Sequence, residues 1–451
     1  MGWKRFVWEK RISIQGKTLQ YLDLLRKWQW LDEREIQKLQ QQRILALLSH
    51  AYQHIPYYRN MMLESGVAEE DGTIHMDRFH QLPLLPRERL QTHFEELKSD
   101  DLHQRKWYEK SSGGSTGVPV TFIQDKEYFA WNQAIKALDD EWSSRGLVDR
   151  QVRLWGSERD LMVGKETKRV LLGRWLRNER WLNSMKMTPE RMRQYVDQIN
   201  FFQPVQILAY VESIYELARF CEQEKLKVHI PKAIMTSAGT LSLEMRDTIE
   251  RVFQTKVFNR YGSRELGDIA CECERHHGLH VSALTHYIEV LKPDGTPAKP
   301  GEVGEIVATL LVNYAMPFIR YRIGDMGVWS ENPCDCGRGL PLLREVTGRV
   351  TDVFIDKRGK WIDGRGIAQL LFRHPFIRKF QVIQEQKDLI RVLIVPMQNH
   401  VDAVKSLEPK IDSITHDIQK IMECHVRFEY CEDIPPSPSG KYRYLLSHVN
   451  R

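Results

Sequence analysis

The chain is 451 residues long, 42% of them hydrophobic and 28% charged, with a formal net charge of +6. This length exceeds one ordinary domain and predicts two or three folding units. No apolar run approaches the ~20 residues that cross a bilayer, and the net charge is small for a nucleic-acid-binding surface. We therefore expect a cytoplasmic protein without a transmembrane segment, a signal peptide or a nucleic-acid partner.

The first hundred residues predict helices and are assigned to an N-terminal region of a large domain, residues 1–100. Four apolar residues recur there at helical spacing: Ile44, Leu47, Leu48 and Ala51. Pro56, in the stretch His54–Arg59, predicts that this helix stops and gives way to extended chain. The proline-bounded segment Leu82–Pro86 predicts a connector.

From about residue 110 to 285 the pattern predicts strands alternating with helices. The apolar runs Val205–Tyr210 and Ala233–Ser237 predict buried parallel strands. Ser242 predicts the N-cap of the helix that follows the second run. Repetition of strand, turn and helix predicts an α/β layered domain, which we assign to residues 101–348.

A β-rich subdomain of this domain is predicted from about residue 285, with a turn at Pro293–Gly295. Its strands are expected near residues 288–291, 305–312 and 318–322. After Gly348-Arg349 the pattern changes to a small α+β domain, residues 349–451, with a hinge near Thr351. Its elements are expected as strands near 380–384, 390–395 and 426–430 and a helix near 401–422.

The segment Ser111–Gly117 combines three glycines with four hydroxyl residues. Glycines allow backbone N–H groups to turn toward a phosphate, and hydroxyls add donors without bulk. The segment is not a Walker A loop, because no Gly-Lys-Ser/Thr follows. A flexible linker is the alternative interpretation of the same composition.

Three later motifs also carry polar groups in places that suit a ligand. Tyr261–Glu265 follows a predicted strand at 256–259, so its side chains are expected at a strand's carboxyl end. Tyr321–Asp325 offers a carboxylate after a predicted strand and a Gly turn, and Pro438–Lys441 places a lysine on a tight turn. Taken singly, each motif is equally consistent with an ordinary turn, strand end or solvated tail.

In this order the motifs resemble the adenylate-forming (acyl-CoA synthetase) superfamily, in particular its branch of phenylacetate–CoA ligases and capsular-polysaccharide-type enzymes. The resemblance covers nearly the whole chain and includes His54–Arg59 and Gly348-Arg349. It implies an α/β fold with a large N-terminal domain and a small, mobile α+β C-terminal domain. It also implies that ATP activates a carboxylic acid, with an aromatic acid as one candidate, as an acyl-adenylate with release of pyrophosphate.

The resemblance further implies residue roles. The phosphates of ATP are assigned to Ser112, Gly113, Gly114, Ser115, Thr116 and Gly117. Glu265 resembles the Mg²⁺-binding carboxylate, Asp325 the ribose ligand, Arg349 a ligand of ribose or phosphate oxygens, and Lys441 the lysine that the small domain brings in for adenylation. The remaining positions of the nucleotide and acyl sites are Tyr261, Gly262, Ser263, Ser237, Ala238 and Gly239, with Trp131, Trp155 and Tyr210 as further acyl-pocket candidates.

The acceptor of the activated acyl group is left open by these residues. A thiol such as CoA is the leading expectation, an amine acceptor or transfer of AMP itself is the alternative, and a non-catalytic scaffold is disfavoured by the presence of Glu265, Asp325, Arg349 and Lys441 together. A homodimer is the default expectation for the oligomeric state.

Four of the seven cysteines form two close pairs, Cys271/Cys273 and Cys334/Cys336. An odd number of cysteines in a reducing compartment argues against a disulfide framework. We predict a closed structural Zn²⁺ site whose ligands are Cys273, His280, Cys334 and Cys336, with Cys271, His276 or His277 able to replace one of them. The resembled branch also carries a structural zinc at a similar place. Free thiols in β loops are the alternative.

Overall fold

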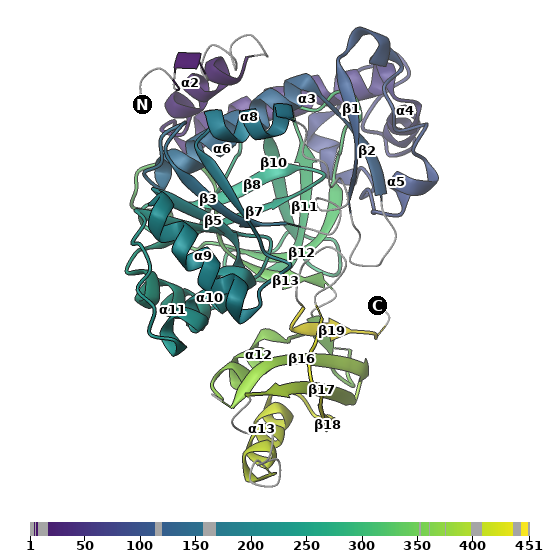
Figure 1. Ribbon diagram of the computed structural model, residues 1–451. Coiled ribbons are helices and arrows are strands. Elements are labelled where there is room, and N and C mark those ends of the chain that lie inside the picture. The colour runs from purple at the N-terminus through teal and green to yellow at the C-terminus, as the bar shows by residue number, and fades with distance from the viewer. Residues whose placement is uncertain are drawn as a thin grey trace. The chain divides into compact units, whose positions relative to one another are not determined.

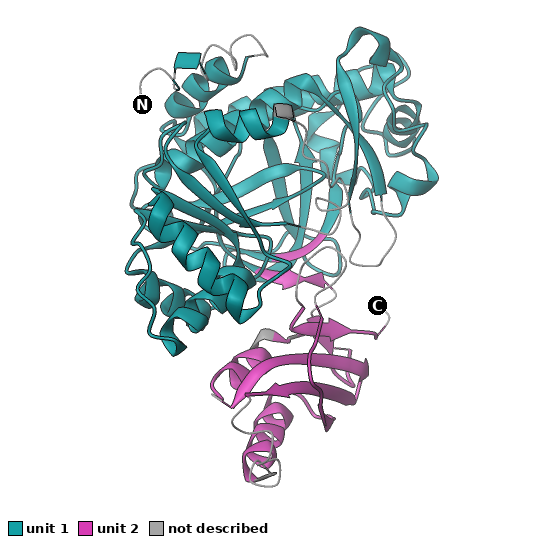
Figure 2. Ribbon diagram, in the orientation of Figure 1, with its two compact units in different colours: residues 1–323, 327–346 teal, residues 324–326, 347–451 magenta. Residues whose placement is uncertain are grey.

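The computed structural model describes residues 4, 6–7, 17–112, 120–156, 168–350, 353–359, 361–374, 376–397, 408–435 and 443–449. The chain divides into two compact units (Figure 2). Unit 1 contains residues 1–323 and 327–346, and unit 2 contains residues 324–326 and 347–451. No helix within the described ranges has the length and apolar character needed to cross a bilayer.

Unit 1 begins with helices, as predicted. They are α2 (Thr18–Trp28), α3 (Glu33–His54), α4 (Pro56–Glu64) and the short α5 (Arg89–Thr92), with 3₁₀ turns at Met76–Gln81 and Asp100–Gln104. The predicted apolar stripe is the buried face of α3, which starts at a capping box between Asp32 and Glu35. Extended chain after Pro56 was the wrong prediction: Pro56 occupies the first turn of α4, where its missing N–H costs nothing.

The two predicted parallel strands lie within the large sheet of eleven strands (Figure 1). Its parallel part consists of β3 (Gln151–Trp155), β4 (Glu179–Asn183), β5 (Gln206–Tyr210), β6 (Ala233–Ser237) and β7 (Val257–Ser263). Every residue of β5 and β6 is buried, which explains their continuous apolar character.

Helices cover the parallel strands. They are α6 (Lys126–Trp142), α8 (Lys168–Leu176), α9 (Pro189–Phe202), α10 (Val211–Gln223) and α11 (Leu243–Phe253). Ser242 is the N-cap of α11, as predicted, since its side chain accepts a hydrogen bond from the Met245 amide. The inner faces of α9, α10 and α11 share one apolar core with the strands, which contains Ile199, Leu217 and Phe253.

The β-rich part of the chain extends the same sheet. Its strands are β8 (Gly267–Glu272), β9 (Leu279–Val281), β10 (His286–Leu291), β11 (Val303–Leu310), β12 (Tyr321–Trp329) and β13 (Leu342–Arg349). Two predicted strands have other bounds: β7 runs on through Ser263, and β12 starts at Tyr321 and passes through Asp325. Pairing with neighbouring strands continues past Gly262 and Gly324, so neither glycine ends its strand.

A separate antiparallel hairpin carries the Gly-rich segment. Its strands are β1 (Trp107–Ser112) and β2 (Val120–Asp125), and the last pair before the connection is Ser112 opposite Val120. The predicted phosphate-binding residues Gly113–Gly117 lie in this connection, outside the described residues.

Unit 2 contains a four-stranded sheet in the order β18-β17-β16-β19. Its elements are β14 (Val353–Ile355), β15 (Trp361–Asp363), α12 (Arg365–Phe372), β16 (Ile377–Gln386), β17 (Leu389–Pro396), α13 (Glu408–Ile421), β18 (His425–Tyr430) and β19 (Leu445–Ser447). The predicted strands are present with longer bounds. Buried Gln384 joins β16 to β14 by bonding both the amide and the carbonyl of Ile355.

Candidate functional site

Arg87 joins the start of the Gly-rich segment to Glu265. Its guanidinium nitrogen Nη1 lies 2.7 Å from Glu265 Oε1, and Nη2 donates to Ser112 Oγ at 2.7 Å. The Glu265 side chain is only 7% exposed, so this pair is shielded from bulk water. The two motifs that the sequence placed 153 residues apart, from Ser112 to Glu265, therefore meet through one cation.

Further hydrogen bonds hold the same two segments together. Gln124 on β2 is fully buried, and its amide nitrogen donates to the carbonyl oxygens of Arg264 at 3.1 Å and Glu265 at 3.0 Å. Arg264 in turn donates to the Ser111 carbonyl at 3.3 Å. Backbone acceptors at both segments thus fix where the Glu265 carboxylate stands relative to Ser112.

Sequence reasoning missed Arg87. The segment Leu82–Pro86, interpreted as a connector, runs beside β12: the Leu85 amide donates to Arg320 O at 2.9 Å, and the Arg322 amide donates to Leu85 O at 3.0 Å. This pairing carries the next residue, Arg87, to Glu265. Two prolines around an apolar pair indicate extended chain, but they do not indicate which strand it joins.

The turn that presents Glu265 is compact. Gly262 approaches Gly267 so closely that a Cβ there would lie 2.4 Å from the Gly267 carbonyl oxygen. Gly267 has a φ of +82°, and a Cβ on it would lie 2.4 Å from Asn132 Oδ1. Ser263 Oγ accepts from the Leu266 amide at 3.1 Å. Larger side chains at either glycine would therefore displace Glu265.

Buried His286 contacts the same turn through a hydrogen bond to Leu266. It is 1% exposed, and its Nε2 lies 2.9 Å from the Leu266 carbonyl oxygen, which requires a proton on that nitrogen. Burial lowers the pKa of His286 to about 4, so the ring is neutral at physiological pH.

The predicted acyl-pocket turn lies at the carboxyl ends of β5 and β6. Tyr210 and Ser237 are paired there, and Ala238 takes the left-handed conformation with φ of +65°. Gly239 follows, and a Cβ on it would meet the Glu212 carboxylate oxygens at 2.5 and 2.7 Å. A negative charge therefore lies directly over this turn.

Two of the three aromatic candidates for the acyl pocket lie together and one does not. Trp155 and Tyr210 pack with ring centroids 4.1 Å apart at the ends of β3 and β5. Trp131 stacks instead on Tyr21 of α2 at 3.8 Å, with Arg43 over its ring. It is a core residue of the helical region, because α6 turns that face toward α2.

Unit 2 brings Asp325 and Arg349 together. Arg349 Nε lies 2.9 Å from Asp325 Oδ1, and the Asp325 side chain is 11% exposed. The predicted ribose ligand Asp325 thus forms an ion pair with Arg349, the predicted ligand of ribose or phosphate oxygens. Lys441, the predicted adenylation lysine, lies outside the described residues, as does Thr351 at the predicted hinge.

The four predicted zinc ligands converge in unit 1. Their ligand atoms all lie within 4.8 Å of one another. Cys273 Sγ lies 3.7 Å from Cys334 Sγ, and Cys336 Sγ lies 3.4 Å from His280 Nε2. Metal–sulfur bonds of ~2.3 Å in a tetrahedron put two sulfurs about 3.8 Å apart, so the spacing fits one zinc ion.

The alternative ligands lie elsewhere or face solvent. The Cys271 thiol points to the Glu272 carbonyl at 3.5 Å, and His276 lies 3.1 Å from Glu272 Oε2. His277 is 56% exposed and pairs with Asp335. Within the described residues, Cys273, His280, Cys334 and Cys336 are the most buried set that could hold a metal ion.

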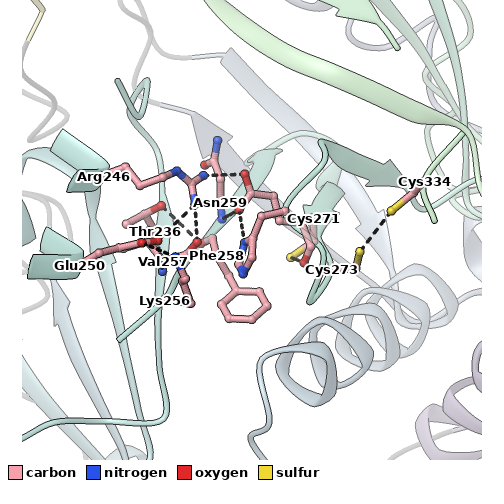
Figure 3. Close-up of polar contacts among 12 residues, drawn as sticks. Thr236, Arg246, Glu250, Lys256, Val257, Phe258, Asn259, Cys271, Cys273 and Cys334 are labelled. Atoms are coloured by element: carbon pink, nitrogen blue, oxygen red, sulfur yellow. Dashed lines mark hydrogen bonds and ion pairs between the residues drawn. The ribbon is translucent and has the colours of Figure 1, made fainter. Parts of the chain in front are cut away.

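Charged side chains lie on both sides of this Cys–His group, and Figure 3 shows the side of Arg246 together with Cys273 and Cys334. Arg246 of α11 donates to the Val257 carbonyl at 2.6 Å and to Glu272 Oε1 at 2.6 Å, next to Cys273. On the other side the Arg338 amide donates to Cys336 Sγ at 3.4 Å, and its guanidinium donates to Gln29 Oε1 at 2.8 Å. The group therefore links α2, α11 and β8.

Comparisons with known proteins agree with the predicted resemblance. The family described as CapK C-terminal domain matches residues 354–448. Protein CapK of Staphylococcus aureus is 22% identical over 97% of this chain and 96% of its own length, and a phenylacetate-coenzyme A ligase of Escherichia coli is 27% identical over 87% of this chain and 86% of its own. The chain is thus homologous to CapK and to phenylacetate-coenzyme A ligases.

Solved structures give the fold. A 2-hydroxyisobutyryl-CoA ligase in the postadenylation state in complex with R3-HIB-AMP has a TM-score of 0.72 and 18% identity, covering 93% of this chain and 90% of that chain. The amide bond synthetase McbA of Marinactinospora thermotolerans has a TM-score of 0.51 and 14% identity, covering 73% and 66%. The predicted adenylate-forming ligase fold is confirmed.

Proposed function

We propose that the protein is an AMP-forming acid–thiol ligase, which activates a carboxylic acid with ATP and passes the acyl group to a thiol such as CoA. The observation that carries the proposal is the Arg87 bridge from Ser112 to Glu265, found on a chain homologous over most of its length to acid–CoA ligases. A cation between a Gly-rich segment and a carboxylate suits a site for polyphosphate and its metal ion.

In the first half-reaction a carboxylate oxygen of the acid attacks the α-phosphorus of ATP. The bond to the bridging oxygen breaks, and pyrophosphate leaves with that electron pair. Glu265 would hold Mg²⁺, which when bound offsets charge on the phosphate oxygens. Ser112–Gly117 and Arg87 would grip the leaving pyrophosphate, and Lys441 would stabilise charge on the transferred phosphoryl group.

The Arg87–Glu265 ion pair has a consequence for this step. One carboxylate oxygen of Glu265 is taken by Arg87. Nucleotide phosphates would draw the guanidinium toward themselves and free that oxygen for the metal ion. Arg87 would thereby couple phosphate binding to metal binding at Glu265.

The other predicted residues complete the proposed site. Asp325, oriented by Arg349, would accept hydrogen bonds from the ribose hydroxyls. Tyr261, Gly262 and Ser263 would lie beside the adenine, and Ser237–Gly239 would border the acyl group. In the second half-reaction the thiol sulfur attacks the acyl carbon, the thiol proton is lost to solvent, and AMP leaves.

We propose that the small domain, residues 349–451, turns about a hinge near Thr351 between the two half-reactions. The lysine at 441 must approach for adenylation and withdraw before a thiol can enter, and a compact ammonium on a flexible stem suits this movement.

The test of adenylation is pyrophosphate release from ATP, Mg²⁺ and a panel of aromatic and aliphatic acids. We expect release with at least one acid, and a loss of about a hundredfold or more in Lys441→Ala. Lys420→Ala is the matched control, because Lys420 is a 64% exposed lysine of the same unit. Release in Lys441→Ala at the rate of the control would contradict the mechanism.

The test of the acceptor adds CoA, and separately primary amines, to the productive acid. We expect acyl-CoA and stoichiometric AMP with CoA. If only amines release AMP and form product, the protein is an amide ligase, the alternative left open by the sequence.

We also propose that Cys273, His280, Cys334 and Cys336 hold one structural Zn²⁺. Their spacing supports this, and burial lowers the pKa of His280 to about 4, which keeps the imidazole in the neutral form that binds metal. Metal analysis of purified protein should find one equivalent of zinc. Less than half an equivalent, together with freely titratable thiols of Cys273, Cys334 and Cys336 in the folded protein, would contradict it.

A further inference from the structure

Lys136 of α6 lies at the solvent-accessible edge of a buried charged group. Its Nζ lies 4.0 Å from Asp268 Oδ2, which is beyond hydrogen-bond distance, and this is its only ion pair within the described ranges. The Lys136 side chain is 39% exposed, whereas that of Asp268 is 12% exposed. Solvent, and therefore a ligand, reaches the ammonium of Lys136 although the carboxylate behind it is enclosed.

The Asp268 carboxylate also serves a second cation. Arg260 Nη1 lies 3.6 Å from Asp268 Oδ2, and Arg260 is buried. Among the residues that the structure describes, neither Asp268 Oδ2 nor Arg260 Nε has a hydrogen-bond partner. Buried polar atoms are normally paired, so the protein alone does not complete the bonding of this group.

Positive charge exceeds negative charge around Lys136. Lys136 and Arg260 share one carboxylate, that of Asp268. Asp139, another buried carboxyl group close to Asp268 and Arg260, has an Oδ2 without a hydrogen-bond partner in the described part of the chain. Burial raises the pKa of Asp139 well above its ordinary value, so this group does not supply a second full negative charge.

The other carboxylates under α6 are committed to arginines. Asp140 Oδ2 lies 2.5 Å from Arg145 Nη1. Glu179 Oε1 lies 3.0 Å from Arg153 and 3.0 Å from Arg177, so two cations share it as well. Neither carboxylate therefore offsets the lysine of α6.

A lysine on the facing hairpin adds to the same positive charge. Lys110 is on β1, and its ammonium lies 5.4 Å from the centroid of the Tyr108 ring. Burial, together with the nearby positive charges of Lys136 and Arg264, lowers the pKa of Lys110 to about 8. Cations from β1, α6 and the neighbouring turn thus lie close enough to repel one another, and a bound anion would relieve this repulsion.

On one side, Lys136 borders the turn that presents Glu265. Asp268 pairs with Gly262 of the neighbouring strand and follows Glu265 by three residues. Asn132, one helical turn before Lys136, accepts a hydrogen bond from the Asp268 amide at 3.1 Å. The lysine therefore lies one helical turn, roughly 6 Å, beyond the residue of α6 that bonds to this strand.

On the other side, Lys136 borders the aromatic pair at the ends of β3 and β5. Burial lowers the pKa of Lys136, and the charges of Arg260 and Arg153 act in the same direction, so Arg153 lies nearby. Arg153 precedes Trp155 by two residues, and side chains two apart in a strand point to the same face of the sheet. Trp155 packs on Tyr210. Lys136 thus lies between the proposed metal-binding turn and this pair, where the proposed function places the acid.

We propose that Lys136 binds a second carboxylate of the acid substrate, so that the acid activated by this protein is a dicarboxylic acid. The proposal rests on the proposed ligase function and names its substrate class. The second carboxylate would pair with the Lys136 ammonium, whose only carboxylate partner is shared and distant, and would offset the excess positive charge. An apolar acid would cover the ammonium and leave it without an acceptor, which weakens binding.

Two other roles fit Lys136 less well. A phosphate ligand would lie at the Glu265 turn, but Tyr128 occupies the part of α6 that contacts this turn. Lys136 follows Tyr128 by about 12 Å of helix. A structural counter-ion of Asp268 would be buried with it and would approach to hydrogen-bond distance, and neither is observed.

The test compares pyrophosphate release with dicarboxylic acids and with their monomethyl esters, which lack one charge but have nearly the same shape. The probes are adipic, pimelic and terephthalic acid. We expect kcat/KM for at least one diacid to exceed that for its ester by about tenfold or more. Lys136→Met should lower kcat/KM for that diacid about tenfold or more and leave the ester unchanged, and Lys136→Arg should recover part of the preference.

The matched control is Lys126→Met, at an exposed lysine in the first turn of the same helix. It should keep the wild-type preference for the diacid. The ratio of the two kcat/KM values is measured within each protein, so a change in the amount of folded enzyme cancels. KM for ATP should be unchanged in Lys136→Met, because the lysine is assigned to the acid and not to the phosphates.

Release with monocarboxylic acids alone, equal kcat/KM for diacid and ester, or an unchanged preference in Lys136→Met would overturn the proposal and leave the ligase function standing. A raised KM for ATP with an unchanged acid preference would make Lys136 a phosphate ligand instead. Absence of release with every acid of either class would contradict the ligase function itself, and the proposal would fail with it.

Discussion

Strand β8 has a group of ligand-type side chains at each end, and the two groups differ in how they satisfy charge. Before it, the Glu265 carboxylate forms an ion pair with the Arg87 guanidinium. After it, Cys273 faces Cys334 and the other two ligands with only soft donors converging. In the proposed function Glu265 would exchange Arg87 for a metal ion, whereas Cys273, His280, Cys334 and Cys336 would keep one ion throughout the reaction.

This difference would let strand β8 support both proposed sites. The strand contains six residues, Gly267–Glu272, so fixing one end limits movement at the other. A closed metal site would anchor β8 to α2 and α11 through Arg338 and Arg246. The turn with Glu265 would then keep its place while its charged partners rearrange during the reaction.

The largest expected effect on activity is that of Glu265→Gln, at the end of β8 where Glu265 pairs with Arg87. The amide cannot hold Mg²⁺ as a carboxylate does, so pyrophosphate release should fall about 10²–10³-fold, or roughly 3–4 kcal/mol of transition-state stabilisation. Metal content should stay at the wild-type value, because the Cys–His group is untouched. The measurement is steady-state release of pyrophosphate at saturating ATP and Mg²⁺.

Two substitutions of Arg87 distinguish a role in nucleotide binding from a role in packing. Arg87→Met removes the cation but keeps most of the side-chain volume, and Arg87→Lys restores a charge without the two-pronged geometry. We expect the apparent affinity for Mg²⁺–ATP to fall about tenfold or more in Arg87→Met, with partial recovery in Arg87→Lys. Equal affinity in all three proteins would show that the bridge is only structural.

Cys334→Ser is the corresponding test of the Cys–His group at the other end of β8. Loss of a ligand should remove the metal and lower the melting temperature by roughly 4 °C, since about 3 kcal/mol shifts a unit of roughly 340 residues by that amount. Cys221→Ser is the matched control, because Cys221 is a buried cysteine of α10 outside the group. At a temperature well below the transition both variants should retain adenylation, and a selective loss in Cys334→Ser would give the closed site a catalytic role.

His286 lies beneath the turn with Glu265 and gives a pH-dependent test. Its pKa is about 4 in the folded protein against 6.5 when exposed, so the unfolded chain binds the proton more readily. The contribution of neutral His286 is present above pH 6.5 and is lost as the pH falls toward 4, by roughly 2–3 kcal/mol.

The measurement is the free energy of unfolding of wild type and His286→Gln at pH 7 and pH 4.5. The difference in free energy of unfolding between wild type and His286→Gln should be smaller at pH 4.5 than at pH 7. Glutamine keeps a donor for the Leu266 carbonyl but does not titrate. His103→Gln, at an exposed histidine, is the control and should run parallel to the wild type.

The fold was largely predictable because its local signals agree with its packing. Continuous apolar runs marked β5 and β6, whose residues are buried on both faces, and Ser242 marked the start of α11. Pro56 misled because proline suits both the end of a helix and the first turn of the next. Local composition does not distinguish these two cases.

The convergence of Cys273, His280, Cys334 and Cys336 was predictable because the chain has two close cysteine pairs with a histidine near one of them, whereas zinc binding itself stays a prediction. The role of Arg87 could not be predicted from the sequence. An arginine after a proline-bounded segment resembles any surface arginine until it is known that Leu85 pairs with β12. The same holds for Glu212: its carboxylate lies over Gly239 because the ends of β5 and β6 are neighbours, which no short-range pattern reports.

The smallest expected effect, and the most informative about the acid substrate, concerns Gly239→Ala. A Cβ at this position would lie 2.5 Å from Glu212 Oε1, so the carboxylate must move by about an ångström at a cost of roughly 1–3 kcal/mol. We expect KM for the acid to rise about tenfold with kcat nearly unchanged.

Glu212→Ala then decides what the carboxylate does. If Glu212 only packs over the turn, its removal leaves KM unchanged and relieves the clash in the double variant Gly239→Ala/Glu212→Ala. If Glu212 recognises the acid, the single variant raises KM by itself and the double variant is no better than Gly239→Ala. In that second case the preferred acid would offer a hydroxyl or amino group that donates a hydrogen bond to the Glu212 carboxylate.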